Sequence, residues 1–409
     1  MVDCRHGGVQ RRRSSGRAAA TGEGTAVATI EISPGQEEET REKTPHERLL
    51  DYGKGRGYKL DWLSYTETFG TKLDVDPERG GLPLQNADHG SFAEAPERSE
   101  NLTGRPRGAI KREAAPHVGN YRVMTKADIW LRNGASLYEE AVQRQWSSAT
   151  DIPWHTLRPL PEDIERAQCE LSTFLTAVEF IAGDIPGKWI ADASPDFYEP
   201  RMFLVTQVMD EARHLDVFRK RALANGGGLT SQGMGLGGAT FGSNFDTIRD
   251  FTEMSARLHL SAEGLVLTLF RMGERMSYNE VEKSIYRLAA SDESRHVAFG
   301  VMHLKYVAEA QPERKEEIHT FLDELEMGLV AQAESAQQQN PLQRGGIAGD
   351  SVNVLLGGGD DHIEEGASIA IAMRQRQIKE YVQRVKVSGF GERFENGRAA
   401  PALDQYASA

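Results

Sequence analysis

The sequence contains few cysteines and no long apolar run, and each of these absences excludes a class of protein. Among its 409 residues only Cys4 and Cys169 are cysteines, which excludes a disulfide framework and favours a reducing compartment. No stretch approaches the roughly 20 consecutive apolar residues that a membrane-spanning helix needs. The basic N-terminal stretch RHGGVQRRRSSGRAAA is followed by no apolar segment, so it is not a secretory signal. We therefore expect a cytoplasmic protein with no membrane partner.

Acidic residues outnumber basic ones, and strand patterns are scarce. The formal net charge is −13, which argues against a nucleic-acid partner. The chain shows no credible run of alternating apolar residues, so we predict an all-α fold. The 39% of hydrophobic residues is enough for a sizeable core.

The composition changes along the chain and divides it into four stretches. Residues 1–55 lack sustained apolar periodicity and are expected to be a disordered tail. Residues 56–135 are polar and rich in Gly and Pro, as in an irregular arm. Residues 136–390 show helical periodicity and are expected to fold as one domain. Residues 391–409 are expected to be a C-terminal tail.

Helical periodicity with start and stop signals predicts six main helices in this domain. The first ends near Gly183 and Pro186, and the fourth begins with a capping box of Ser277 and Glu280. The predicted helices cover residues 161–183, 199–224, 246–276, 277–310, 312–338 and 362–388. A GxGxxG match that begins at Gly233 follows no strand, so we interpret it as a crossover loop and not as a dinucleotide site.

One five-residue pattern, Asp-Glu-x-Arg-His, occurs twice inside apolar helical runs. The first copy spans Asp210–His214 and the second spans Asp292–His296. Residues i and i+3 of a helix share a face, so Glu211 pairs with His214 and Glu293 pairs with His296. Each helix then offers one carboxylate and one imidazole to the same point.

Two further glutamates complete a dinuclear metal site of the kind found in helical bundles. Two residues that lie at the same level of an antiparallel helix pair are separated from the connecting turn by the same number of residues. Glu179 matches Glu211 across the turn ASPDF, and Glu263 matches Glu293 across MSYNE. Neighbouring acids fit worse, because Glu170 and Glu253 lie on other faces or at other depths. The alternative is a pair of ordinary amphipathic helices with chance spacings.

The charge of this set favours two divalent cations. Four buried carboxylates without counter-charge would be prohibitive or would take up protons, whereas two divalent ions neutralise them. Mixed carboxylate and imidazole ligands suit iron or manganese, while structural zinc prefers thiolates.

We call the two copies of Asp-Glu-x-Arg-His the first and the second word. Their remaining residues are expected to support the ligands. A metal-bound histidine usually donates its second N–H to a carboxylate, so Asp210 is expected to reach His296 and Asp292 to reach His214. Arg213 and Arg295 either balance these aspartates or form ordinary salt bridges between helices.

At these residues the chain resembles the oxygen-activating branch of the ferritin-like di-iron carboxylate superfamily. The resemblance is strongest to bacterial multicomponent monooxygenase hydroxylases and to the ribonucleotide reductase small subunit, and it covers about residues 161–310. It implies a ferritin-like four-helix bundle with flanking helices, two iron ions or a Mn/Fe pair, and dioxygen as co-substrate.

The chain departs from each sub-family at one characteristic position. Phe218 stands where the radical-storing small subunit usually has Tyr, although a metal-based radical variant has Phe there. Leu267 replaces the Thr of the hydroxylases, with Thr268 one position away, and Ala289 replaces the third histidine of arylamine N-oxygenases. His259, one turn before Glu263, is interpreted as a seventh ligand, a proton relay or an ordinary buried histidine.

These residues lead to three functional hypotheses. The first is a di-iron monooxygenase that oxidises a small or carrier-bound organic substrate with electrons from a separate reductase or ferredoxin. The second is a Mn/Fe or Fe/Fe oxidase similar to the ribonucleotide reductase small subunit, and the third is a non-catalytic metal-binding bundle. A homodimer is left open. Small residues at the ligand level, such as Gly264, Ala290 and Gly300, either leave space for substrate or allow close helix packing.

Overall fold

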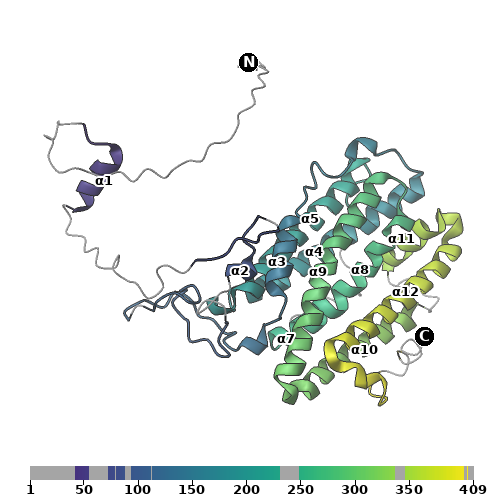
Figure 1. Cartoon of the computed structure of the whole chain (residues 1–409). Helices are drawn as coiled ribbons and strands as arrows, with labels where there is room; N and C mark the ends of the chain where they lie inside the picture. The colour runs from purple at the N-terminus through teal and green to yellow at the C-terminus, as the bar shows by residue number, and fades with distance from the viewer. Residues whose placement is uncertain are drawn as a thin grey trace. The chain divides into compact units, whose positions relative to one another are not determined.

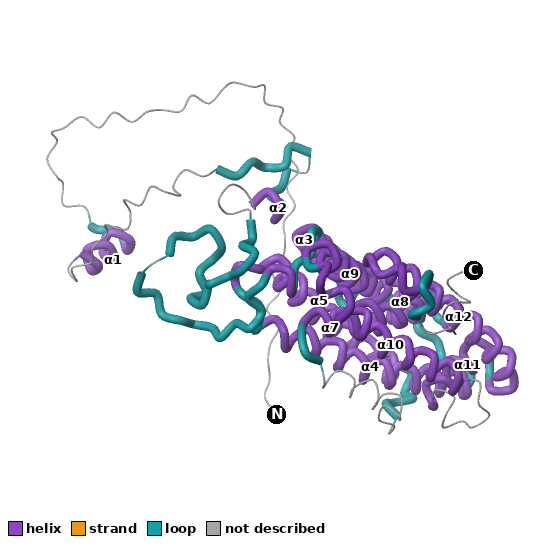
Figure 2. Tube along the Cα trace, turned by 90° about the horizontal axis from the view of Figure 1, so that it is seen from below, coloured by secondary structure: helices purple, strands orange, loops and turns teal. Residues whose placement is uncertain are grey.

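The computed structural model is built from helices, helical turns and irregular segments. It describes residues 42–54, 72–78, 80–87, 94–111, 113–230, 248–336, 346–399 and 403. Within these ranges no β-strand forms, and only two isolated bridges pair extended residues. The all-α prediction is therefore confirmed (Figures 1 and 2). The chain divides into two compact units, residues 1–69 and 70–409, which are described separately.

The described part of the first unit is one short helix, α1 (Pro45–Lys54). The side chains and backbone of Thr44 and Glu47 cap it reciprocally, since Thr44 N–H donates to Glu47 Oε2 and Glu47 N–H donates to Thr44 Oγ1. We expected residues 1–55 to lack regular structure, and α1 differs from that expectation. Its N-terminal cap stabilises the helix locally, although the surrounding sequence lacks sustained apolar periodicity.

Four long helical segments form the core of the second unit and run alongside one another (Figure 1). The short connection after α4 and the turn before α9 make two antiparallel pairs, α4 with α5 and α8 with α9, and α5 also packs on α9. Apolar side chains such as Leu175, Phe218 and Phe299 are fully buried between them. The segments are α4 (Glu162–Ile190), α5 (Tyr198–Ala224), α7 to α8 (Phe251–Ser255 and Glu263–Arg271) and α9 (Glu280–Ala310).

Shorter helices flank this bundle. On one side α12 packs on α8 and on α11, and α11 also contacts α4. On the other, α3 packs on α5 and α9. The flanking helices are α2 (Leu84–Ala87), α3 (Gly134–Gln143), α10 (Lys315–Ala336), α11 (Gly346–Gly357) and α12 (Ile363–Val385). Helix α11 was not among the six predicted helices.

Two predicted helix ends were wrong. Helix α4 continues through Gly183 and Pro186 to Ile190, because Ile185 is buried and Trp189 packs against the same core cluster. Burial of these residues outweighs the backbone hydrogen bond that Pro186 cannot make. The capping box of α9 is formed by Asn279 with Glu282, not by Ser277 with Glu280.

The third helical segment contains a π-helical stretch, Ala256–Ala262, between α7 and α8. Its wider backbone turn is visible where Glu263 N–H donates to Leu258 O, five residues earlier. Asp250 caps the start of the segment by accepting from Glu253 N–H at 2.8 Å. Stretches of this kind often occur at functional sites, and this one leads directly into a predicted metal ligand.

The irregular segments of the second unit are attached to the bundle by buried polar contacts. Arg107 pairs with Glu199 at the start of α5, and Ser99 donates to Asp196 at 2.7 Å. At the other end of the chain, Arg393 is fully buried and donates to Glu326 at 2.8 Å. The boundaries of the four stretches stay a prediction, and the GxGxxG match at Gly233 lies outside the described residues. Each described helix is too short or too polar to span a lipid bilayer.

Candidate metal centre

The structure brings the six predicted ligands together at one level of the bundle. Glu179 comes from α4, Glu263 begins α8, and the two repeated words lie on α5 and α9. None of the six is more than 3% exposed. Their donor atoms form two overlapping groups that could each hold a metal ion. The groups are Glu179, Glu211, His214 and Glu293, and Glu211, Glu263, Glu293 and His296.

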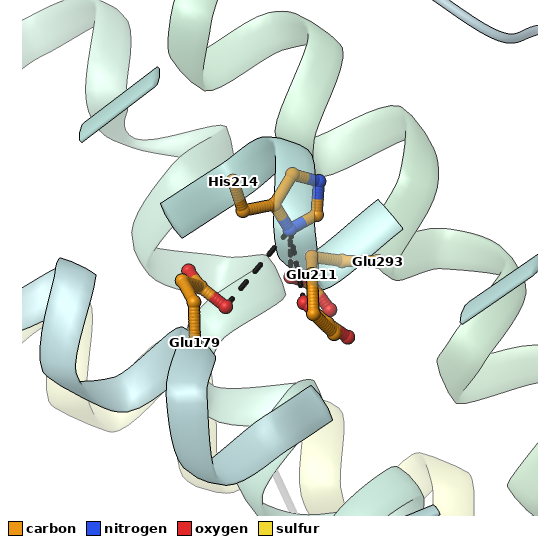
Figure 3. A group of neighbouring side chains, drawn as sticks. All are labelled: Glu179, Glu211, His214 and Glu293. Carbon is orange, nitrogen blue, oxygen red and sulfur yellow. Dashed lines mark hydrogen bonds and ion pairs between the residues drawn. The ribbon is translucent and has the colours of Figure 1, made fainter. Parts of the chain in front are cut away.

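The first group is centred on Nδ1 of His214 (Figure 3). This nitrogen lies 3.1 Å from Glu211 Oε2 and 3.3 Å from Glu293 Oε1. Glu179 Oε2 is farther away, at 3.9 Å. Figure 3 shows the three carboxylates around the same side of the imidazole, which leaves Nε2 pointing away from them.

The second group repeats this arrangement around His296. Its Nδ1 lies 3.1 Å from Glu211 Oε1, 3.2 Å from Glu293 Oε2 and 3.5 Å from Glu263 Oε2. Glu211 and Glu293 thus offer one oxygen to each histidine, while Glu179 and Glu263 each serve one side. The two imidazole rings are 6.4 Å apart, so they can serve two neighbouring ions bridged by the shared carboxylates.

Burial and mutual repulsion raise the pKa values of the two outer acids, Glu179 and Glu263. Burial, followed by the charge of Glu211, raises the pKa of Glu179 well above its usual value. Burial and the charge of Glu293 do the same to the pKa of Glu263. Burial also opposes ionisation of Glu293, but hydrogen bonds with Glu263 and the histidines hold its pKa below its usual value.

The two histidines are also held in their protonated form. Burial alone would lower the pKa of His214, but hydrogen bonds to Asp292 and Glu211 raise it well above its usual value. For His296, the charge of Glu211 and a hydrogen bond to Asp210 outweigh burial and raise the pKa in the same way. Protons therefore supply the positive charge that the carboxylates require.

The residues present fit divalent cations. Glu179 Oε1 is buried and has no hydrogen-bond partner, although a buried carboxylate oxygen normally has one. The donor set contains four carboxylates and two imidazoles and no thiolate, which suits iron or manganese better than structural zinc. That these six residues bind metal stays a prediction.

The second nitrogen of each imidazole faces an aspartate of the other word. His214 Nε2 is 3.2 Å from Asp292 Oδ2, and His296 Nε2 is 3.3 Å from Asp210 Oδ2. These are the two crossed contacts that the sequence led us to expect. With each Nε2–H donated to an aspartate, Nδ1 of each ring is left for a metal ion.

Both arginines of the words lie beside both aspartates. Arg213 is 2.5 Å from Asp210 and 2.9 Å from Asp292, and Arg295 is 3.3 Å and 2.5 Å from the same two residues. The four charges form a closed, buried arrangement between α5 and α9. The pKa values of both aspartates are below their usual range, because the hydrogen bonds to the histidines and the arginine charges outweigh burial.

Two residues after α3 extend this network, and the sequence had not indicated their role. Trp146 Nε1–H donates to Asp292 Oδ2 at 2.7 Å, and the indole stacks near His214 with ring centres 6.3 Å apart. Gln145 donates to Asp210 Oδ1 at 3.3 Å and accepts a hydrogen bond from Arg213. No spacing rule links residues so far from the words along the chain.

His259 is not part of either ligand group. Its Nε2 lies 3.0 Å from Gln207 Oε1, and Gln207 Nε2 donates to Glu263 Oε1 at 3.2 Å. The structure therefore gives no support to the interpretation of His259 as a seventh ligand. Its side chain reaches Glu263 only through Gln207. Gln207 was missed, although its position one turn before Glu211 puts it on the ligand face of α5.

The side chains or backbone at other positions singled out in the sequence contact neighbouring protein groups and lie outside both ligand groups. Thr268 Oγ1 donates to Glu380 Oε2 on α12 at 2.7 Å and does not belong to the ligand groups. Phe218 packs against Phe270, with ring centres 5.4 Å apart. A side chain on Gly264 would overlap Arg384, and one on Gly300 would overlap His259. At these two glycines close packing, and not substrate space, is what the structure shows.

Comparisons with known proteins add only distant structural similarity. No family model matches the sequence, and a search of curated proteins finds no match. One similar solved structure is "R2-like ligand-binding oxidase with aerobically reconstituted Mn/Fe cofactor (long soak)", with 17% identity and a TM-score of 0.46 over 63% of this chain and 93% of that chain. Another, "R2-like ligand-binding oxidase with aerobically reconstituted metal cofactor after photoconversion", has 15% identity and a TM-score of 0.46 over 62% and 93%. Similarity at this level carries no argument, so the function has to be argued from the site itself.

Proposed function

We propose that this chain is an oxidoreductase that holds two redox-active metal ions, as a di-iron or a Mn/Fe pair, and activates dioxygen to oxidise an organic substrate. The observation that carries the proposal is the pair of overlapping ligand groups, which share Glu211 and Glu293 and are buried. A surface cluster of acids would not place two imidazoles against shared carboxylates.

The two ions would be held by this chain's residues in defined roles. Glu211 and Glu293 would bridge them, and the Nδ1 atoms of His214 and His296 would each bind one. Glu179 and Glu263 would complete the two sides. Bound ions of this type supply electrons and act as Lewis acids towards dioxygen.

The surrounding protein would fix the geometry and exclude bulk water. Asp292 and Asp210 hold the histidines by their second nitrogens and fix the proton on that side of each ring. Phe203 and Phe299, stacked with centres 4.8 Å apart, and Phe270 close the space around the imidazoles. Electrons would come from a separate reductase or ferredoxin, since the GxGxxG match at Gly233 follows no predicted strand and is not a credible dinucleotide site.

Metal analysis combined with spectroscopy tests this proposal. The protein is loaded anaerobically with Fe(II), or with Mn(II) and Fe(II), and is then exposed to oxygen while its optical and electron paramagnetic resonance spectra are recorded. We expect about two ions per chain and a transient absorption band that decays faster when a substrate is present. Protein that binds no metal, or metal that does not react with oxygen, would overturn the proposal and would favour a non-catalytic bundle.

The same experiment separates the two redox hypotheses. A monooxygenase would consume oxygen and return to its starting spectrum after oxidising its substrate. An oxidase similar to the ribonucleotide reductase small subunit would instead keep a persistent paramagnetic signal. Phe218 bears on this second case, because a phenylalanine at that position has no phenolic hydrogen to lose. A persistent signal would therefore have to reside on the metal pair or on another residue.

A further inference from the structure

The candidate metal centre has two halves, one around Glu179 and His214 and the other around Glu263 and His296. The residues one helical turn before the ligands differ between the two halves. The first word is preceded there by Gln207 on α5, and the second word is preceded by Ala289 on α9. In the other two helices the corresponding positions are His259 in the π-helical stretch and Leu175 in α4. All four side chains are fully buried, so only one half of the centre has polar groups at this level.

The polar half forms a chain of hydrogen bonds with a fixed direction. Ser255 Oγ lies 3.0 Å from His259 Nδ1, and His259 Nε2 lies 3.0 Å from Gln207 Oε1. Because an amide oxygen only accepts, His259 must donate its Nε2–H, and its Nδ1 must then accept from Ser255. Gln207 is left with its NH₂ facing Glu263 Oε1, to which it donates at 3.2 Å. When Glu263 is ionised, as it must be to bind an ion, the reverse amide orientation would point the amide oxygen at a carboxylate oxygen.

Packing holds this chain in place. The ring of His259 meets the ring of Phe299 edge to face, with centres 5.1 Å apart. The absence of a side chain at Gly300 lets α9 approach the backbone and Cβ of His259. Burial and the nearby charge of His296 lower the pKa of His259 well below its usual value, which keeps the ring neutral.

The carboxylate of the other half has no such support. Glu179 Oε1 is buried without a hydrogen-bond partner, whereas Glu263 Oε1 accepts from Gln207. On the Glu179 side, the apolar Leu175 and Ala289 occupy the positions that His259 and Gln207 occupy on the Glu263 side. The two outer carboxylates of an otherwise repeated centre are therefore not equivalent.

We propose that Gln207, oriented by His259, is a positioning residue that fixes Glu263 Oε1 and leaves Glu263 Oε2 for the metal ion beside His296. The proposal rests on the metal-binding function proposed above and extends it. The side of the centre beside His296 is preorganised, and the side beside Glu179 takes its final geometry only when an ion binds. Preorganisation makes the His296 side the tighter of the two sites.

Anaerobic titration of the metal-free protein with Co(II) tests this inference without relying on turnover. The absorption bands of Co(II) report the coordination of each site, and equilibrium dialysis gives its affinity. The unsubstituted protein is expected to bind two Co(II) ions in two steps. Gln207→Leu should weaken the tighter site by about 10- to 100-fold and change its spectrum, while the weaker site keeps its affinity.

A second variant and a double variant make the readout specific. His259→Leu introduces the residue found at the corresponding position of the other half, so it should fold, and it should weaken the same site because Gln207 loses its orienting donor. In a Glu263→Ala background, Gln207→Leu should cause no further loss of affinity, since the glutamate through which it acts is gone. If Gln207→Leu weakens Co(II) binding equally in the unsubstituted protein and in the Glu263→Ala background, the inference is overturned.

Gln168→Leu is the matched control. It removes another buried amide, 2% exposed, which bonds Ser172 on α4 and lies outside both ligand groups. It should leave both Co(II) affinities and both spectra unchanged. If Gln207→Leu behaves like this control, the positioning role is wrong although the metal site stands. If the unsubstituted protein binds no Co(II), both proposals fail together.

Discussion

Metal binding at this centre should release protons. In the metal-free protein four ligands have raised pKa values, namely Glu179, Glu263, His214 and His296. Each must lose a proton before its ligand atom can bind an ion. Loading two divalent ions should therefore release protons, up to four when all four groups are protonated. The free energy of binding the pair should become more favourable by about 5 kcal/mol per pH unit while all four groups hold their protons.

The same groups set how the stability of the metal-free protein depends on pH. The unfolded chain releases its glutamate protons near 4.5 and its histidine protons near 6.5, whereas the folded protein keeps them to higher pH. Above pH 6.5 the folded state therefore binds more protons than the unfolded state. The free energy of unfolding then falls as the pH rises, until the raised pKa values are passed. Bound ions replace the protons and should remove this loss.

Two measurements check this reasoning. Proton release is followed with an indicator dye in weak buffer while Fe(II) or Co(II) is added anaerobically. Thermal unfolding of the metal-free and metal-loaded protein is compared between pH 6 and 9. We expect the difference between their Tm values to grow with pH. Metal binding without proton release, or a metal-free protein that becomes more stable as the pH rises, would refute the assignment of these protons.

Four further substitutions give separate tests. Glu211→Ala or His296→Ala should abolish both metal loading and turnover, and full metal content in either variant would contradict the ligand assignment. Trp146→Phe removes the indole donor to Asp292, so the free energy of unfolding should fall by about 1–3 kcal/mol in chemical denaturation while metal binding persists. Arg221→Met leaves Glu165 and Glu282 without their buried partner, and it should cost about 3–5 kcal/mol with no change in metal stoichiometry. An unchanged denaturation midpoint in either of these two variants would show that the ion or donor contributes little.

The sequence was sufficient to predict the four main helices and the convergence of the six candidate ligands. The repeated words fix their own glutamate and histidine, because residues three apart on a helix share a face. Glu179 and Glu263 followed from the depth of matching positions in antiparallel pairs. Both inferences rest on regular helix geometry, which the local sequence determines.

Features that depend on contacts between distant segments were not predicted. Gln207 and Trp146 acquire their roles only when α5, the π-helical stretch and the residues after α3 meet. His259 was named as a ligand, a proton relay or an ordinary buried histidine, but its contact with Gln207 was not predicted. The continuation of α4 through Pro186 depends on the core that receives Ile185. The π-helical stretch itself has no distinctive residue pattern, since Ala256–Ala262 also fits an ordinary α-helix.

The combination of four carboxylates and two imidazoles at one level of the bundle separates a ligand site from a structural role. Burying ionic groups is costly, and replacing a buried ion network by apolar side chains is often neutral or stabilising by about 1–4 kcal/mol. One turn before the ligands, Leu175 and Ala289 show that these helices also carry apolar residues facing the core. The crossed Asp–Arg pairs alone would serve to hold α5 and α9 in register. They do not account for Glu179, whose buried oxygen has no partner, or for Glu263, which a separate chain of hydrogen bonds orients towards His296. Two cations between the carboxylates account for all of these positions at once.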